Sequence, residues 1–137
     1  MIKAISTEKA PAAIGPYSQA VMTGNPNGRM TIYTSGQIPI NPETGAIVAG
    51  GIAEQTTQVL ENLKQVLEAS SSSLSKVVKT TLFIRNMNDF ASINEIYATY
   101  FSEPYPARST VEVARLPKDV LIEIEAVAIM EDVCGIL

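Results

Sequence analysis

The order of predicted elements indicates an α+β fold, in which a mixed β-sheet carries two helices on one face. Three observations support this class. Short β-branched segments come first, an amphipathic helix and a strand–helix pair follow, and two further strands end the pattern. The length of 137 residues fits one domain, spanning residues 1–137, with a core of ordinary size.

The first part of the chain predicts three strands and a loop. Residues 3–6, 18–23 and 30–35 are rich in apolar and β-branched side chains, as strands require. The sequence GNPNG lies between the second and third segments and has the composition of a turn, so we expect these strands to form a hairpin. The segment GQIPINPETGAIVAGG, residues 36–51, is rich in glycine and proline and predicts a loop.

Two helices are predicted from apolar residues that recur at intervals of three and four. The first covers residues 51–69, and the serine-rich sequence SSSSLS is expected to end it. A β-branched strand at 76–85 follows. The second helix is expected to use Asn88 or Asp89 as its N-cap and to continue to residue 101.

Asn94 interrupts the apolar stripe of the second predicted helix. It follows Phe90 by four residues and precedes Tyr97 by three, which puts all three on one helix face. Two interpretations stay open. The amide is either a buried group with satisfied hydrogen bonds or a group that faces a pocket beyond the edge of the stripe.

The segment YPARSTVEVARLPKDVLIEIEAVAIM, residues 105–130, predicts two strands joined by a short turn that contains proline. Side chains alternate along a strand, so Arg108 and Thr110 share one face. In the final strand the aliphatic even-numbered residues suit the helices, whereas Glu123 and Glu125 point the other way. We therefore expect Arg108 and the carboxylates to project together from the helix-free face of a terminal hairpin.

Three interpretations of this polar face stay open. It is an ordinary solvated sheet face, a structural salt bridge between Arg108 and a glutamate, or a binding site. The planar fork of arginine binds a carboxylate with two parallel hydrogen bonds, so Arg108 can hold a small organic acid. A neighbouring glutamate can orient or deprotonate a water. The sequence TSGQ at 34–37 adds a glycine, where backbone approaches a ligand closely.

Composition excludes several classes of function. Charged residues make up 18% of the chain, against roughly 25% in ordinary soluble domains, so we expect self-association to cover part of the surface. The absence of histidine excludes Ser-His-Asp triads, Cys-His pairs and histidine-ligated metal sites. The single cysteine, Cys134, allows no internal disulfide and no zinc cluster, and we expect a packed or frayed thiol rather than a chemically active one. A net charge of −4 disfavours a broad nucleic-acid surface.

Neither a membrane nor a secretory signal is expected. No apolar segment approaches the roughly 18 residues of a spanning helix. The N-terminal sequence MIKAISTEKAPAA carries charges where a signal peptide needs an apolar stretch. We expect a cytoplasmic protein, and a mitochondrial location stays open.

Four segments together resemble the RidA family, also called the YjgF or L-PSP endoribonuclease family: APAAIGPYSQA, TSGQIPINPETG, VVKTTLFIRNMNDFASIN and PARSTVEVARLPKDVLIEIEA. The resemblance covers nearly the whole chain. It implies a chorismate-mutase-like fold and a homotrimer with sites between subunits, and it implies no cofactor and no metal. The implied activity is deamination of 2-imino acids such as 2-iminobutanoate and 2-iminopropanoate. Hydrolysis of these imines, or of the enamines that pyridoxal-phosphate enzymes release, gives 2-keto acids and ammonia.

By position, the resemblance implies that Arg108 binds the substrate carboxylate and that Glu123 positions the water. The further pocket positions that it implies are Tyr17, Ser35, Gly36, Asn94 and Thr110. Thr110 stands where many relatives have cysteine. Either a thiol is dispensable at this position or the substrate range of this protein differs.

Two other functions stay open. The older family name implies RNA cleavage or inhibition of translation. The acidic composition and the absence of histidine disfavour both functions. A non-enzymatic trimer that binds small acids needs Arg108 but not Glu123. Replacing Glu123 with glutamine distinguishes this binding protein from an enzyme. The substitution should leave ligand binding intact in both cases, and it should damage turnover only if the protein is an enzyme.

Overall fold

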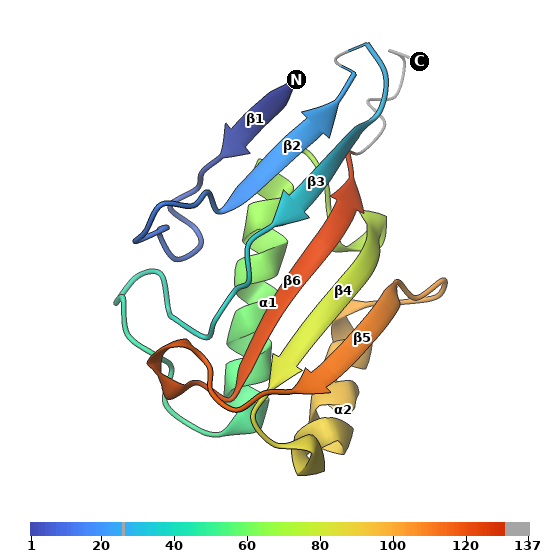
Figure 1. Ribbon diagram of the computed structural model, residues 1–137. Helices are drawn as coiled ribbons and strands as arrows, with labels where there is room; N and C mark the ends of the chain where they lie inside the picture. Colours follow the sequence, from blue (N-terminus) through green and yellow to red (C-terminus); the bar gives the residue numbers. More distant parts are fainter. Residues whose placement is uncertain (26, 131–137) are drawn as a thin grey trace.

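The computed structural model describes residues 1–25 and 27–130, and these form a six-stranded sheet with two helices behind it (Figure 1). The elements in chain order are β1 (Ile2–Ile5), β2 (Ala20–Gly24), β3 (Met30–Thr34), α1 (Ile52–Ala69), β4 (Val77–Ile84), α2 (Phe90–Tyr100), β5 (Ala107–Glu112) and β6 (Ile122–Ile129). The predicted α+β class is confirmed. No helix in the described ranges combines the length and apolarity needed to cross a membrane.

The strands lie in the order β1-β2-β3-β6-β4-β5, so the last strand in the sequence is inserted between β3 and β4. Neighbours from β1 to β4 pair antiparallel, and β5 joins β4 in parallel. A parallel pair needs a long crossover, which α2 supplies between β4 and β5. The hairpin of β2 and β3 is confirmed, and the sheet is mixed as expected.

The expected terminal hairpin is wrong. β5 and β6 do not pair, because β4 lies between them and binds both. Alternation along each strand predicts which residues share a face, but it does not name the partner strand. Parallel pairing with β4 places β5 where α2 can cover it, as crossover helices do for parallel strands.

The hydrophobic core lies between the sheet and the two helices. The sheet contributes alternate residues of its central strands: Leu82, Ile84, Ile122, Ile124, Ala126 and Ala128. The first helix contributes one stripe: Val59, Leu60, Leu63, Val66 and Leu67. Full burial of each large aliphatic side chain contributes about 1.5–3 kcal/mol, which fixes the face that each strand turns toward the helices.

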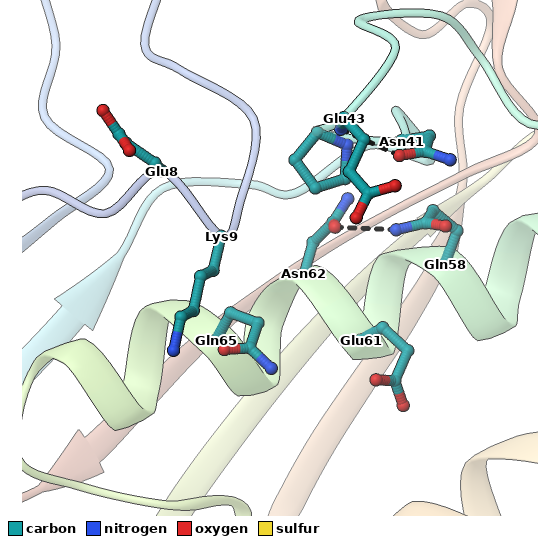
Figure 2. Close-up of a pocket in the computed structure, with 9 residues that line it drawn as sticks. Glu8, Lys9, Asn41, Glu43, Gln58, Glu61, Asn62 and Gln65 are labelled. Carbon is teal, nitrogen blue, oxygen red and sulfur yellow. Dashed lines mark hydrogen bonds between the residues drawn. The ribbon is translucent and has the colours of Figure 1, made fainter.

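Asn62 of α1 holds the loop that follows β3. Its Nδ2 donates to the carbonyl oxygens of Ile38 at 3.1 Å and Ile40 at 2.9 Å. Its Oδ1 accepts from Gln58 Nε2 at 2.8 Å, as Figure 2 shows. The side chain is only 1% exposed, so these bonds satisfy a buried amide. The loop is thereby fixed to a rigid helix.

Gln19 fixes the N-terminal loop in a similar way. Its Oε1 accepts from the Thr7 backbone N–H at 2.7 Å. Its Nε2 donates to the carbonyl oxygens of Thr7, Ala10 and Pro11 at 3.0, 3.3 and 2.7 Å. Both loops that frame the cavity described below are therefore tied down by buried amides.

Candidate active site

A cavity of about 690 Å³ opens where the N-terminal loop, the loop after β3 and the turn before β6 meet. Its wall is largely apolar, with a few polar side chains, which is the usual character of small-molecule sites. The apolar part includes Ile14, Ile38 and Ile40, and the polar part includes Tyr17, Ser35 and Glu123.

Gly36 determines where the Glu123 carboxylate can lie. A Cβ atom on Gly36 would stand 2.7 Å from Cδ and 2.9 Å from Cγ of Glu123, closer than non-bonded carbons approach. The backbone beside the glycine is fixed, because Gln37 and Ile124 exchange two hydrogen bonds of 2.8 and 3.1 Å. Only glycine leaves room for this glutamate against this backbone.

The pKa of Glu123 is raised above its usual value. Burial is the main cause, and the negative charge of Glu125 on the same strand face adds to it. No hydrogen bond to this carboxylate offsets the effect within the described residues. A carboxyl group with a raised pKa can both accept a proton from water and return it, as general acid–base chemistry requires.

Arg108, Asn94 and Thr110 form a second group, on β5 and α2. Arg108 Nη1 donates to Asn94 Oδ1 at 2.7 Å. The guanidinium carbon lies 5.4 Å from the ring centroid of Phe90 and 4.9 Å from that of Tyr97. In the part of the chain that the structure describes, no carboxylate forms a salt bridge with Arg108. Its other N–H donors can therefore bind a ligand.

The expectation that Arg108 shares the helix-free face with Glu123 is wrong. In the register of β4 and β5, Arg108 lies beside Thr80, which is fully buried beneath the helices. Glu123 lies beside Phe83, which alternation places on the opposite face. The alternation of side chains was predicted correctly within β5 and within β6. The assumed hairpin, however, put Arg108 of β5 and Glu123 of β6 on the same face of the sheet, whereas pairing of both strands with β4 puts them on opposite faces. The carboxylates Glu123 and Glu125 do project from the helix-free face.

Asn94 is half-buried, and its Oδ1 accepts a hydrogen bond from Arg108, so the interpretation of a satisfied amide is supported. That Asn94 faces a pocket stays a prediction. Thr110 Oγ1 is buried and has no hydrogen-bond partner among the described residues. An unpaired buried hydroxyl costs about 1–3 kcal/mol, which makes this group a candidate for contact with a ligand. Cys134 lies outside the described residues.

The structure thus divides the expected site residues into two groups. One group lines the cavity and consists of Tyr17, Ser35, Gly36 and Glu123. The other consists of Arg108, Asn94 and Thr110. They lie on opposite faces of the sheet and are separated by β4, which alone implies roughly 10 Å between the β6 and β5 backbones. One small ligand cannot contact both groups of the same chain.

Sequence reasoning missed the contribution of the turn before β6. Pro117 and Lys118 line the cavity together with Glu123. Lys118 and Asp119 have φ angles of 55° and 56°, which are uncommon for residues with a side chain. Arg115 holds Asp119 through hydrogen bonds of 2.7 and 3.2 Å. In the sequence this segment gave only a turn signal.

A polar hollow of about 470 Å³ over α1 is less suited to bind a ligand (Figure 2). It is lined by side chains such as Glu8, Lys9, Glu43 and Gln65. Its buried amide, Asn62, has all its partners. Within the described residues, no buried polar side-chain atom without a partner lines this hollow. The hollow therefore reflects the anchoring of a loop to α1.

Fold and site together define a class of small α+β proteins that bind a compact organic acid. Arg108, which has no salt-bridge partner among the described residues, suits the carboxylate of such an acid, and Glu123 suits a reactive water. Residues 7–130 match the family model described as endoribonuclease L-PSP, and the chain belongs to this family. The resemblance inferred from the sequence is confirmed.

Individual relatives cover almost the whole chain. It is 53% identical to the 2-iminobutanoate/2-iminopropanoate deaminase of Escherichia coli K12, over 94% of this chain and 98% of the relative. It is 50% identical to the protein of the same name from Mus musculus, over 93% and 90% of the two chains. The crystal structure of the YjgF gene product of E. coli is 52% identical and has a TM-score of 0.85, with 94% of this chain and 99% of that chain covered.

Proposed function

We propose that this protein hydrolyses 2-imino acids, and the enamines that tautomerise to them, to 2-keto acids and ammonia. The names of the relatives from E. coli and mouse support this activity. The observation that carries the proposal is the chemistry of two side chains. Arg108 has no acidic partner among the described residues, and Glu123 is a carboxyl group with a raised pKa in a cavity.

The reaction needs few groups because the imine carbon is already electrophilic. Arg108 holds the substrate carboxylate through paired N–H donors. Glu123 takes a proton from water while the water oxygen bonds to C2 and the electrons of the C=N bond move to nitrogen. Glu123 returns this proton to nitrogen, which gives a carbinolamine. Glu123 then takes the hydroxyl proton while the C=O bond forms and the C–N bond breaks with its electrons going to nitrogen, and this second proton passes to nitrogen to give ammonia. One imine and one water give one keto acid and one ammonia.

The coupled test of this proposal uses a pyridoxal-phosphate dehydratase to generate the imine. Release of the 2-keto acid is followed with and without the protein, and we expect a faster release in its presence. No metal or cofactor takes part in the proposed chemistry, so exhaustive chelation should leave the rate unchanged. Loss of activity after chelation, or no acceleration at all, would contradict the proposal.

The proposal includes a homotrimer with sites between subunits. Arg108 and Glu123 can contact one substrate only if different copies of the chain supply them, because within one chain they lie on opposite faces of the sheet. The helix-free face also exposes apolar side chains, Tyr33 on β3 and Val111 on β5, which suit an interface. Light scattering is expected to give three times the mass of one chain, and a monomer at micromolar concentration would contradict this.

Mixed oligomers test the shared site directly. Arg108→Ala and Glu123→Gln chains are each expected to be inactive alone. When equal amounts are refolded together, about a quarter of the sites should pair an intact Glu123 with an intact Arg108, and about a quarter of the wild-type activity should return. A mixture that stays inactive, although mass spectrometry shows mixed oligomers, would place both residues in one chain.

Gly36→Ala is expected to lower kcat roughly tenfold to a hundredfold, since the new methyl group displaces the Glu123 carboxylate. The backbone of Gly36 is not in the left-handed region, so alanine can adopt it and the melting temperature should change little. Gly28→Ala, in the hairpin turn, is the matched control and should retain activity. Normal turnover in Gly36→Ala would show that the position of Glu123 is unimportant.

A cytoplasmic location is part of the proposal, because a short-lived imine must be hydrolysed in the compartment where it forms. RNA cleavage is not part of it. A net charge of −4 offers little attraction for phosphates. Ribonuclease activity that persists through purification and disappears in Arg108→Ala would favour that function instead.

A further inference from the structure

Arg108 is held in place by side chains that carry no charge. Phe90, Asn94 and Tyr97 lie about one turn apart on one face of α2, and all three contact the guanidinium. The rings attract the cation through their π faces, and the amide accepts one of its five N–H groups. The group of Phe90, Asn94 and Tyr97 is called the neutral clamp below.

The inner ring of the neutral clamp is itself rigidly placed. Tyr97 is 6% exposed, and its hydroxyl lies 2.8 Å from Thr80 Oγ1 in a hydrogen bond. Thr80 is the β4 neighbour of Arg108 in the strand register, so the three residues form a closed loop of contacts. The Phe101 ring also packs on Tyr97, with 4.5 Å between centroids. Burial raises the pKa of the Tyr97 phenol, a group that is neutral at physiological pH even at its ordinary pKa.

A neutral clamp has a different consequence from a salt bridge. A glutamate beside Arg108 would fix the guanidinium equally well, but it would compete with a substrate carboxylate for the same N–H groups and cancel much of their charge. Aromatic faces and one amide oxygen restrict the guanidinium while leaving its charge and most of its donors available. Preorganisation of this kind lowers the entropy lost when the ligand binds.

We infer that Tyr97 and Phe90 are positioning residues, which fix the Arg108 guanidinium for an incoming carboxylate without neutralising it; this inference rests on the proposed function. They act through Arg108, so they should influence substrate binding more than the chemical step. The inference predicts a rise in KM and in the dissociation constant for a 2-keto acid, with a smaller change in kcat.

Phe90 is the better position for mutation because it is 38% exposed and contributes little to the core. Phe90→Leu is expected to weaken binding of 2-oxobutanoate roughly three- to tenfold, measured by titration calorimetry. Phe90→Trp should restore most of the affinity, since it returns an aromatic face. Met87→Leu changes another exposed apolar side chain just before α2 and is the matched control, with wild-type affinity expected.

Tyr97 needs a pair of variants because it is buried. Tyr97→Leu is expected to weaken binding at least as much as Phe90→Leu. Tyr97→Phe should recover most of that affinity although Thr80 loses its partner and the melting temperature falls. Affinity that instead follows the melting temperature across the two variants would indicate a merely structural role and would overturn the inference.

The NMR signal of the Arg108 Nε–H group reports on the neutral clamp without any substrate. In the wild type we expect this resonance to be displaced by the ring currents of Phe90 and Tyr97, and Phe90→Leu should move it toward the position of a solvated arginine. An undisplaced wild-type resonance would overturn the inference, as would wild-type affinity in Phe90→Leu. A displaced resonance in a wild-type protein that neither binds 2-oxobutanoate nor hydrolyses imines would count against the proposed function alone.

Discussion

Replacement of Arg108 by lysine is expected to lower kcat/KM for a 2-imino acid at least about tenfold, although the charge is conserved. Lysine presents a compact ammonium group without the planar fork, so the two parallel hydrogen bonds to the carboxylate cannot form. Charge-assisted hydrogen bonds contribute about 1.5–3 kcal/mol each, which sets the size of the loss. In addition, 2-keto acids should no longer raise the melting temperature of the variant.

The competing explanation is that Arg108 serves assembly, for example through a salt bridge to a glutamate of another copy. In that case the lysine variant should lose stability or oligomer mass first. Melting temperature, mass and specific activity are therefore measured on one sample. Normal specific activity in the assembled Arg108→Lys variant would show that the Arg108 guanidinium is not needed to bind the substrate.

Glu123→Gln is expected to lower kcat about a hundredfold or more, the usual contribution of a general acid–base. Binding of a 2-keto acid should persist, because Arg108 is unchanged. Glu125→Gln is the matched control: it should retain turnover, while the loss of its negative charge moves the apparent pKa of Glu123 downward. A Glu123→Gln variant with full turnover would contradict the mechanism.

The same variant has a defined effect on stability. Because burial raises the pKa of Glu123 in the folded state, the folded protein binds this proton more tightly than the unfolded chain does. The contribution of Glu123 to the free energy of unfolding therefore falls as pH rises from the unfolded pKa through the folded pKa. Glu123→Gln should be more stable than the wild type at pH 7, and this advantage should be lost below about pH 4. Urea denaturation at both pH values measures the difference.

The elements of the fold were predictable because each has a period that the sequence displays. Apolar residues at intervals of three and four marked α1, and strict alternation marked β6. Strand pairing was not predictable in this way. The segment from 105 to 130 has the composition of a hairpin, which would pair β5 with β6. In the folded protein β5 pairs with β4 instead, and this choice of partner depends on contacts between distant parts of the chain.

The candidate site shows the same division between local and long-range information. The family resemblance named both Glu123 and Gly36 as pocket residues. That the two lie side by side is a finding of the structure, which explains it through the space that glycine leaves. The relative positions of Arg108 and Glu123 depend on the parity of two strands that never touch, which local patterns do not contain. The role of Tyr97 was also missed, since a tyrosine in an apolar helix stripe has the same pattern as an ordinary core residue.

The position of β6 at the centre of the sheet has a consequence for how the protein is made. Synthesis proceeds from the N-terminus, so β1, β2 and β3 and the unit of β4, α2 and β5 are complete before the strand that joins them exists. Until residues 122–129 leave the ribosome, β3 and β4 each present an open edge, which is a template for unwanted pairing with other chains. The nascent chain therefore has two unpaired edges until the last strand is available, and β6 pairs with both.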